Sequence, residues 1–367
     1  MGKKLNQERE FSIPVDVIRT IAIIGVILLH ATGDLTVQQM NQFEVFRWVT
    51  VDIYQSVGRI GVPLFLMLTG ALLLQPSKLD EPIGVFFKKR WARIGLPIIF
   101  WGVVFFAWDF LVEHQTFTSN AVIQGILTGP YRQFWYFYVL LGLYLLTPIL
   151  RVVMAHAGSN LIKYLLILWL LGASLIPAAS SLTTYNLDSN VFAFTGYAGY
   201  FILGAYLLTV RMRRSALLIF MSLGIALTAI GTYAMAATVG GVEIFFFQDY
   251  FSPTIILASV MLFLLLNTIQ VPPSQQRVDQ KEINPTKSVH PKVRKLLSVI
   301  SQNTLPIFLF HLIILESLQK GYFGIAINGN TINSIIGVPL MTVITLLISL
   351  AIIIPLKKVP ILKKLIG

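Results

Sequence analysis

The chain of 367 residues is 56% hydrophobic and only 12% charged, and its mean hydropathy is +0.76. A soluble domain is about 45–50% apolar and about 25% charged, so these charges are too few to cover a soluble enzyme. The composition also excludes a disordered chain and a collagen-like fibre. Cysteine is absent, which excludes a disulfide framework, a Cys-ligated metal and a thiol nucleophile.

Ten apolar stretches are each close to the roughly 20 residues that a helix needs to cross a membrane. They predict an all-α polytopic bundle of about ten transmembrane helices, organised as a single domain over residues 1–367. The first stretch lacks a small-x-small cleavage site, so we expect a retained anchor and not a signal peptide. In chain order the stretches cover residues 13–33, 56–75, 92–112, 134–154, 161–179, 192–210, 215–237, 253–271, 297–317 and 333–356.

Basic residues gather in alternate loops, which predicts the orientation of the chain. The positive-inside rule is satisfied if the N- and C-termini are cytoplasmic, and the long polar segment 272–296 is then a cytoplasmic loop. Of the 28 basic residues, Arg19 lies within the first span, and four are then predicted on the extracytoplasmic side: Arg47, Arg59, Arg132 and Lys320. The others lie in the predicted cytoplasmic segments. This placement explains the net charge of +12 without nucleic acid, and it suits a cell membrane protein whose cytoplasmic face attracts anionic membrane lipids.

The first span carries ionisable residues, which are costly in a bilayer and therefore candidates for function. Arg19 and His30 are eleven residues apart, so they face within roughly 20° of each other, and their Cα atoms are separated by roughly 16 Å along the axis. Asp16 lies one turn before Arg19, and Asp34 lies one turn beyond His30. Two other interpretations stay open: Asp16 and Arg19 form an ion pair at the interface, and His30 is a packing residue.

A second basic cluster begins the third span. Arg90 and Arg93 are three residues apart and share a helix face, with Lys88 and Lys89 beside them. Guanidinium groups fit phosphate oxygens, so the cluster is a candidate phosphate clamp. The competing interpretation is that these positive charges only anchor the cytoplasmic end of the third span at the membrane surface.

Further polar and aromatic residues lie in or near other spans. His311 lies in the ninth span, where Pro306 is expected to kink the helix or to free backbone groups. Glu316 lies further out on the same span. Trp135 and Tyr136 begin the fourth span, where an interfacial aromatic belt is the competing interpretation.

Five segments in this order resemble the acyltransferase 3 family of integral membrane acyltransferases, and most of all its stand-alone sugar O-acetyltransferase branch. The pair Arg19 and His30 resembles the Arg-x10-His motif of the family, and Arg90 with Arg93 resembles its Arg-x-x-Arg motif. The remaining similarity lies in RIGVPLFLMLTGALL, FWYFYVLLGLYLLTPILR and SQNTLPIFLFHLIILE. The chain departs from the family pattern at Leu66, Thr69, Gln133 and Phe308, where Phe, Ser, His and Tyr are usual.

The resemblance implies transfer of an acyl group, usually acetyl from cytoplasmic acetyl-CoA, to a hydroxyl of an extracytoplasmic or lipid-linked glycan, without a metal. It assigns the CoA phosphates to Arg19, Lys89, Arg90 and Arg93, with Asp16 beside them. His30 is the expected base, because its unperturbed pKa lies near 6.5, and Asp34 or Glu316 is expected to orient it. The acceptor is expected to contact Asp52, Arg59, Trp135, Tyr136 and His311.

A transporter or flippase for a polar or anionic substrate is the alternative, since ten spans with intramembrane charges suit one equally well. A homodimer also fits the sequence. No inverted repeat, which a transporter would more often show, is visible.

Overall fold

A computed structural model describes residues 14–33, 45–116, 118–183, 196–238, 246–269, 290–324, 326–327 and 332–367 of the chain. These residues fold into helices and turns, and no strand occurs among them, as the composition predicts. Asp34 and most of the predicted loop 272–296 lie outside the described residues.

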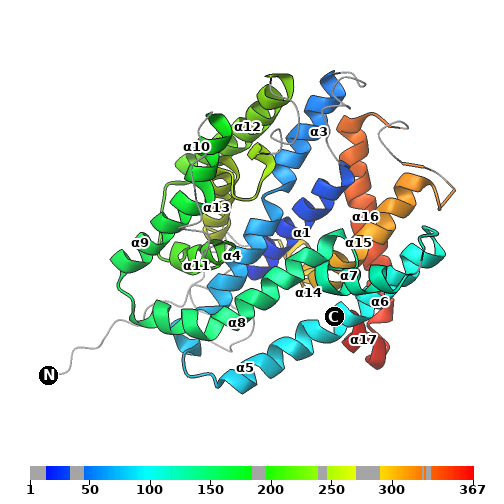
Figure 1. The fold of residues 1–367 in the computed structure, drawn as a ribbon, viewed down its shortest axis with the longest axis horizontal. Coiled ribbons are helices and arrows are strands. Elements are labelled where there is room, and N and C mark those ends of the chain that lie inside the picture. The colour runs from blue at the N-terminus through cyan, green and yellow to red at the C-terminus, as the bar shows by residue number, and fades with distance from the viewer. Residues whose placement is uncertain are drawn as a thin grey trace.

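The helices lie in chain order as follows (Figure 1): α1 (Val15–Ala31), α3 (Val45–Gly58), α4 (Gly61–Leu73), η1 (Pro76–Lys78), α5 (Ile83–Arg90), the π-helix η2 (Trp91–Gly95), α6 (Leu96–Leu111), α7 (Ser119–Thr128), η3 (Arg132–Phe134), α8 (Trp135–His156), α9 (Ser159–Leu170), the π-helix η4 (Leu171–Leu175), α10 (Ile176–Leu182), α11 (Ala198–Leu207), α12 (Arg214–Thr238), α13 (Pro253–Asn267), α14 (Pro291–Gln302), α15 (Thr304–Lys320), α16 (Ser334–Leu356) and α17 (Pro360–Ile366).

Within the described residues, seven helices are long and apolar enough to cross a membrane, or eight if the bent pair α14 and α15 counts as one span. Each of the ten predicted stretches contains helix, but α1 has 17 residues and α11 has 10, which is short for a span. The predicted second span also begins too late, because α3 and α4 run together over Val45–Leu73.

The predicted ninth span is not one straight helix. α14 and α15 meet at an angle of 76° next to Asn303, and Pro306 lies in the first turn of α15. A proline has no N–H, so Pro306 leaves the Gln302 carbonyl without its helical donor, and the Lys357 ammonium donates to that oxygen at 3.2 Å. The predicted effect of Pro306 is therefore present, with the bend placed just before it.

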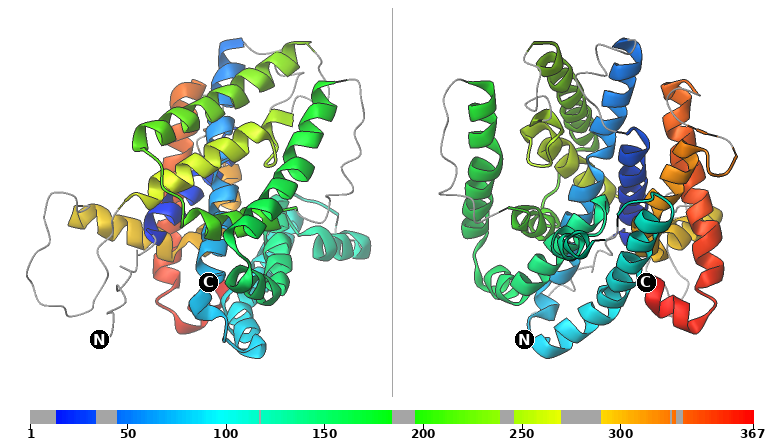
Figure 2. Two further views of the ribbon diagram at one scale, coloured as in Figure 1. Left: turned by 90° about the vertical axis from the view of Figure 1, so that its left-hand side faces the viewer. Right: turned by 45° about the vertical axis from the view of Figure 1, so that its right-hand side comes forward.

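α1 is the central helix of the molecule (Figure 2). It packs against α3, α4, α14, α15 and α16. Glycine permits the closest of these crossings: a Cβ atom on Gly61 would lie 2.7 Å from the Ala22 carbonyl oxygen. α1 is thereby held deep in the bundle, with His30 at its last turn.

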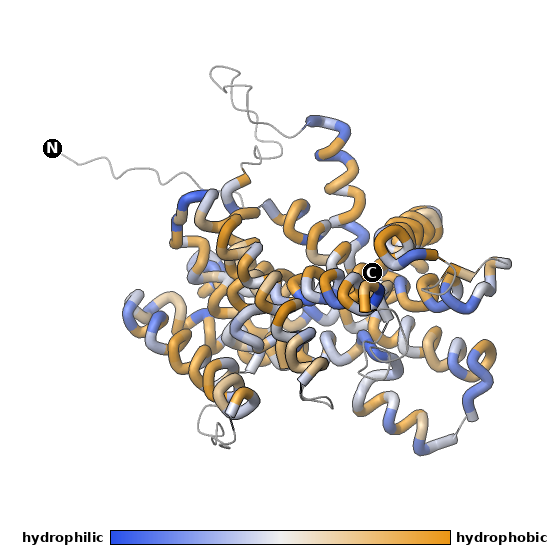
Figure 3. Tube along the Cα trace, turned by 90° about the horizontal axis from the view of Figure 1, so that it is seen from above, coloured by the Kyte–Doolittle hydropathy of each residue, from blue (hydrophilic) through white to orange (hydrophobic). Residues whose placement is uncertain are grey.

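Large apolar side chains cover the outside of the helices. Examples are Val103, Leu145 and Ile230, which are exposed to 64%, 68% and 64%. Figure 3 shows the hydrophobic colour along most of the helical tubes. Such a surface is unstable in water and suits contact with lipid tails.

Candidate active site

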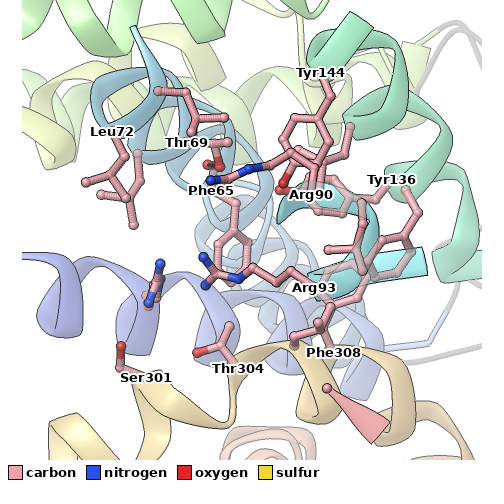
Figure 4. A pocket seen from close by; sticks show the side chains of 18 of the residues that line it. Phe65, Thr69, Leu72, Arg90, Arg93, Tyr136, Tyr144, Ser301, Thr304 and Phe308 are labelled. Atoms are coloured by element: carbon pink, nitrogen blue, oxygen red, sulfur yellow. Dashed lines mark hydrogen bonds between the residues drawn. The ribbon is translucent and has the colours of Figure 1, made fainter. Parts of the chain in front are cut away.

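A cavity of about 520 Å³ opens between α1, α4, α8 and the junction of α14 with α15. We call it the cationic cavity, because its charged lining residues are all basic: Arg19, Lys78, Arg90 and Arg93. Figure 4 shows the guanidinium groups of Arg90 and Arg93 reaching into it. The lining side chains carry four positive charges and no carboxylate, and such clustered positive charge favours a polyanionic ligand.

Local backbone structure aims these two arginines. Arg90 ends α5, and Arg93 lies within the π-helix η2, a wider helical turn at the start of the predicted third span. Such π turns occur often at functional sites. The Arg90 guanidinium also lies over the Phe86 ring, 5.4 Å from its centroid, which restricts its orientation.

Lys89 lies outside the cavity lining, although the resemblance places it with the phosphate-binding residues. Its ammonium bonds to Glu81 at 2.6 Å, and Arg151 reaches the other oxygen of Glu81 at 3.0 Å. The hydrogen bond from Lys89 lowers the pKa of the Glu81 carboxyl, so Glu81 stays ionised and its single negative charge partly offsets these two cations.

Lys78 takes the place in the cavity that was expected for Lys89. It follows α4 in the short helix η1, and its ammonium donates to the Leu72 carbonyl oxygen at 2.8 Å. Burial, with help from the charge of Arg90, lowers the pKa of Lys78. The sequence offered no signal for it, because an isolated lysine in a loop resembles any anchoring charge.

Arg19 lines the cavity from α1, and Asp16 lies in the first turn of the same helix. The described residues contain no ion pair between Asp16 and Arg19, although both side chains belong to them. The two side chains therefore form no direct ion pair, although the charge of Asp16 still acts on Arg19.

Aromatic rings form the inner wall of the cationic cavity. Phe65, Tyr136 and Phe137 line it and surround Phe308, with ring centroids 6.2, 5.2 and 5.4 Å from that of Phe308. Phe308 is in turn 5.9 Å from the His311 ring. One aromatic layer thus separates the cations from His311, and Tyr136 belongs to this layer.

His30 and His311, 281 positions apart in the chain, form a pair whose Nδ1 and Nε2 atoms lie 3.3 Å apart. His30 Nδ1 is 2.8 Å from the Val26 carbonyl oxygen, and His311 Nδ1 is 2.8 Å from the Phe308 carbonyl oxygen. A carbonyl only accepts, so we assign the proton of each neutral ring to Nδ1 and the lone pair to Nε2. His30 therefore presents a basic nitrogen away from its helix carbonyl.

The hydrogen-bond partners of Glu316 are a tyrosine and an arginine, and not an imidazole. It accepts from the Tyr131 hydroxyl at 2.5 Å and from Arg132 at 3.3 Å. These bonds tie α15 to the turn that precedes α8. Glu316 therefore does not orient His30 in this arrangement. Asp34, the other carboxylate expected to orient it, lies outside the described residues.

Asp52, one of the residues expected to contact the acceptor, is packed inside the protein. Asp52 is 1% exposed and accepts from Gln248 at 2.7 Å, in an interior polar cluster with Ser56 and Thr232. These contacts fix α3 against α12 and the segment that precedes α13, and they leave Asp52 no open path to a ligand.

Trp135 and Arg59 belong to an aromatic cluster. The Trp135 ring lies 5.6 Å from both the Tyr197 and the Tyr250 rings, and the Arg59 guanidinium lies 5.3 Å from the Tyr250 centroid. Neither residue lines a described cavity.

A second, smaller cavity of about 80 Å³ adjoins the C-terminal end of α1, next to His30 in the chain. We call it the outer cavity. Its polar lining includes Thr32, Arg47, Gln319 and Ser334. The sequence pattern missed these residues, because single polar residues at span ends are common.

One further observation concerns metal binding. Among the described residues, no group of three acidic or histidine side chains could hold a metal ion.

The family model for an acyltransferase domain, acyltransferase 3, matches residues 14–354. Comparisons with curated proteins and with solved structures give no match.

Proposed function

Since the chain belongs to the acyltransferase 3 family of membrane acyltransferases, we propose that it moves an acetyl group from cytoplasmic acetyl-CoA to a hydroxyl of an extracytoplasmic or lipid-linked glycan. The proposal is supported mainly by the succession of groups along the site, which runs from four cations through an aromatic wall to the histidine pair. We place the protein in the cell membrane, with the cationic cavity facing the cytoplasm.

The donor end fits coenzyme A by charge. Its phosphates are multiply anionic, and Arg19, Arg90 and Arg93 can form charge-assisted bonds to them, while Lys78 adds a point charge. The rise of roughly 16 Å from Arg19 to His30 is of the order of the length of an extended pantetheine arm. The thioester would then pass along the wall of Phe65, Tyr136 and Phe308.

The chemistry needs one base. The lone pair on His30 Nε2 takes the proton of the acceptor hydroxyl as its oxygen attacks the thioester carbonyl. The tetrahedral intermediate then collapses, the C–S bond breaks, and the CoA thiolate takes the proton back from His30. The products are the acetyl ester and free CoA, so no metal or redox partner is required.

The acceptor would approach from the C-terminal end of α1. The outer cavity is too small for a whole sugar ring and suits one hydroxyl-bearing edge, with Thr32 and Gln319 as hydrogen-bonding groups. Glu316, Tyr131 and Arg132 lie along the outer part of α15 as further contacts. A transporter or flippase is not favoured, because the family match spans nearly the whole chain.

The test combines donor binding with product detection. The protein in lipid nanodiscs is titrated with acetyl-CoA in a thermal-shift assay, and cell-surface glycans are compared by mass spectrometry with and without the gene. We expect stabilisation by acetyl-CoA and acetyl groups on the glycans that depend on the gene. Absence of both results would refute the proposed function.

The base is tested by His30→Gln, which keeps hydrogen bonding without basicity. A general base contributes a factor of about 10²–10⁴, so this variant should bind acetyl-CoA normally and lose most of the transfer. His30→Ala should behave in the same way. Strong residual transfer by His30→Gln would assign His30 a structural role.

A further inference from the structure

His311 is fully buried, and its hydrogen bonds account for both ring nitrogens. Its Nδ1–H lies 2.8 Å from the Phe308 carbonyl oxygen and 3.2 Å from that of Ile307. Its Nε2 lies 3.3 Å from Nδ1 of His30, which is its hydrogen-bond partner among the described residues. A buried nitrogen lone pair needs a donor, so the His30 N–H is shared between the Val26 carbonyl and His311.

This contact becomes stronger during the reaction. When His30 Nε2 takes the hydroxyl proton, its ring becomes an imidazolium and its Nδ1–H becomes a charged donor. Hydrogen bonds from charged donors are roughly twice as strong as neutral ones. His311 then does what a carboxylate does for the histidine of a triad, without an anion that would be costly to bury.

We propose that His311 is the positioning residue of His30: its Nε2 accepts the His30 Nδ1 proton, holds the basic nitrogen toward the reacting atoms and stabilises the imidazolium. The inference rests on the proposed function and replaces the expected contact of His311 with the acceptor. It also replaces Glu316 as the group that orients the base. His311 itself touches no reacting atom in this arrangement.

The experiment uses the full-length protein in nanodiscs, with dodecyl maltoside as a sugar acceptor and release of CoA as the readout. The chain has no cysteine, so a thiol reagent detects only CoA. His311→Leu removes the acceptor nitrogen, and kcat should fall about tenfold to a hundredfold while the acetyl-CoA KM stays within about twofold. In the His30→Gln background, the same change should cause no further loss.

Two polar variants keep the test decisive if His311→Leu does not fold. His311→Gln places an acceptor near the Nε2 position and should retain kcat within about fivefold, whereas His311→Asn reaches only the Nδ1 position and should not. Ser317→Ala is the matched control, because Ser317 is a buried polar residue of the same helix that bonds to the Ile313 carbonyl. Equal activity of the Gln and Asn variants, or equal loss in the two His30 backgrounds, would overturn the inference.

A measurement without turnover separates this inference from the proposed function. The chain has five histidines, so selective ¹⁵N labelling gives few imidazole signals. The His30 signals should report an Nδ1–H tautomer and should shift in His311→Gln but not in Ser317→Ala. Unchanged His30 signals would refute the pair even in an active enzyme, whereas shifted signals in a protein that does not bind acetyl-CoA would refute only the proposed function.

Discussion

At the scale of single residues, a carboxylate decides which cations remain available around the cationic cavity. Glu81 forms ion pairs with Lys89 and Arg151, so these two charges are partly offset within the protein. Arg93 lines the cavity itself and forms no ion pair among the described residues. Neighbouring basic residues in one sequence cluster therefore lie in different surroundings.

Arg93→Ala should weaken acetyl-CoA binding, because one charge-assisted contact to a phosphate is lost. Such a contact is worth about 1.5–3 kcal/mol, or roughly tenfold to a hundredfold in affinity. Isothermal titration of the nanodisc protein measures the change. Lys89→Ala is the control and should change the affinity by less than about threefold, since exposed ion pairs contribute little. The same affinity in both variants would remove Arg93 from the site.

Glu81→Gln should change how stability depends on pH. The pKa of Glu81 is lowered in the folded protein, so ionised Glu81 stabilises the fold above its unfolded pKa, and this contribution is lost as the pH falls through the folded value. Glu81→Gln should therefore lower the Tm at neutral pH and flatten the decline of Tm below about pH 4.5. Thermal unfolding from pH 7 to pH 3 tests this, and parallel curves for both proteins would contradict it.

At the scale of elements, close helix crossings fix the frame around the site. α4 crosses α11 so tightly that a Cβ on Gly204 would lie 1.9 Å from the Met67 carbonyl oxygen. Met67 lies on α4 between Phe65 and Thr69, two residues from each, and these two residues line the cationic cavity. The crossing thus positions one wall of the cavity.

Gly204→Ala should destabilise the protein, because the methyl group overlaps backbone that cannot move without separating α4 from α11. Overpacking typically costs about 1–3 kcal/mol, which should lower the Tm by several degrees. Gly142→Ala in α8 is the matched control, since a Cβ there meets nothing within 4 Å. Thermal unfolding in one detergent compares the two variants, and an equal Tm would contradict the assigned packing.

At the scale of the whole molecule, the apolar outer surface and the spans indicate a multi-pass membrane protein. The distribution of basic residues among the loops predicts the side of each terminus. We expect both termini in the cytoplasm. A tag on either terminus should resist labelling by an impermeant reagent in intact cells and react after permeabilisation. Labelling of a terminal tag in intact cells would reverse the orientation.

The all-helical class, the position of most spans and the family were predictable from the sequence, because each depends on local properties. Hydropathy identifies a span within about 20 residues, and the spacing of Arg19 and His30 on one helix follows from helix geometry. Asp16, Arg90 and Arg93 were also found by local spacing. The predicted count of ten spans is not confirmed, because α1 and α11 are short and Asn303 separates α14 from α15.

Only the tertiary structure decided which side chains meet. His311 joins His30 across 281 positions, and Lys78, not Lys89, completes the cationic cavity. Glu316 and Asp52 were expected to act on the base and the acceptor, yet Tyr131, Arg132 and Gln248 bind them instead. Contacts of this kind depend on how helices rotate and cross, and those angles are set by packing at positions such as Gly61 and Gly204, far from the residues concerned.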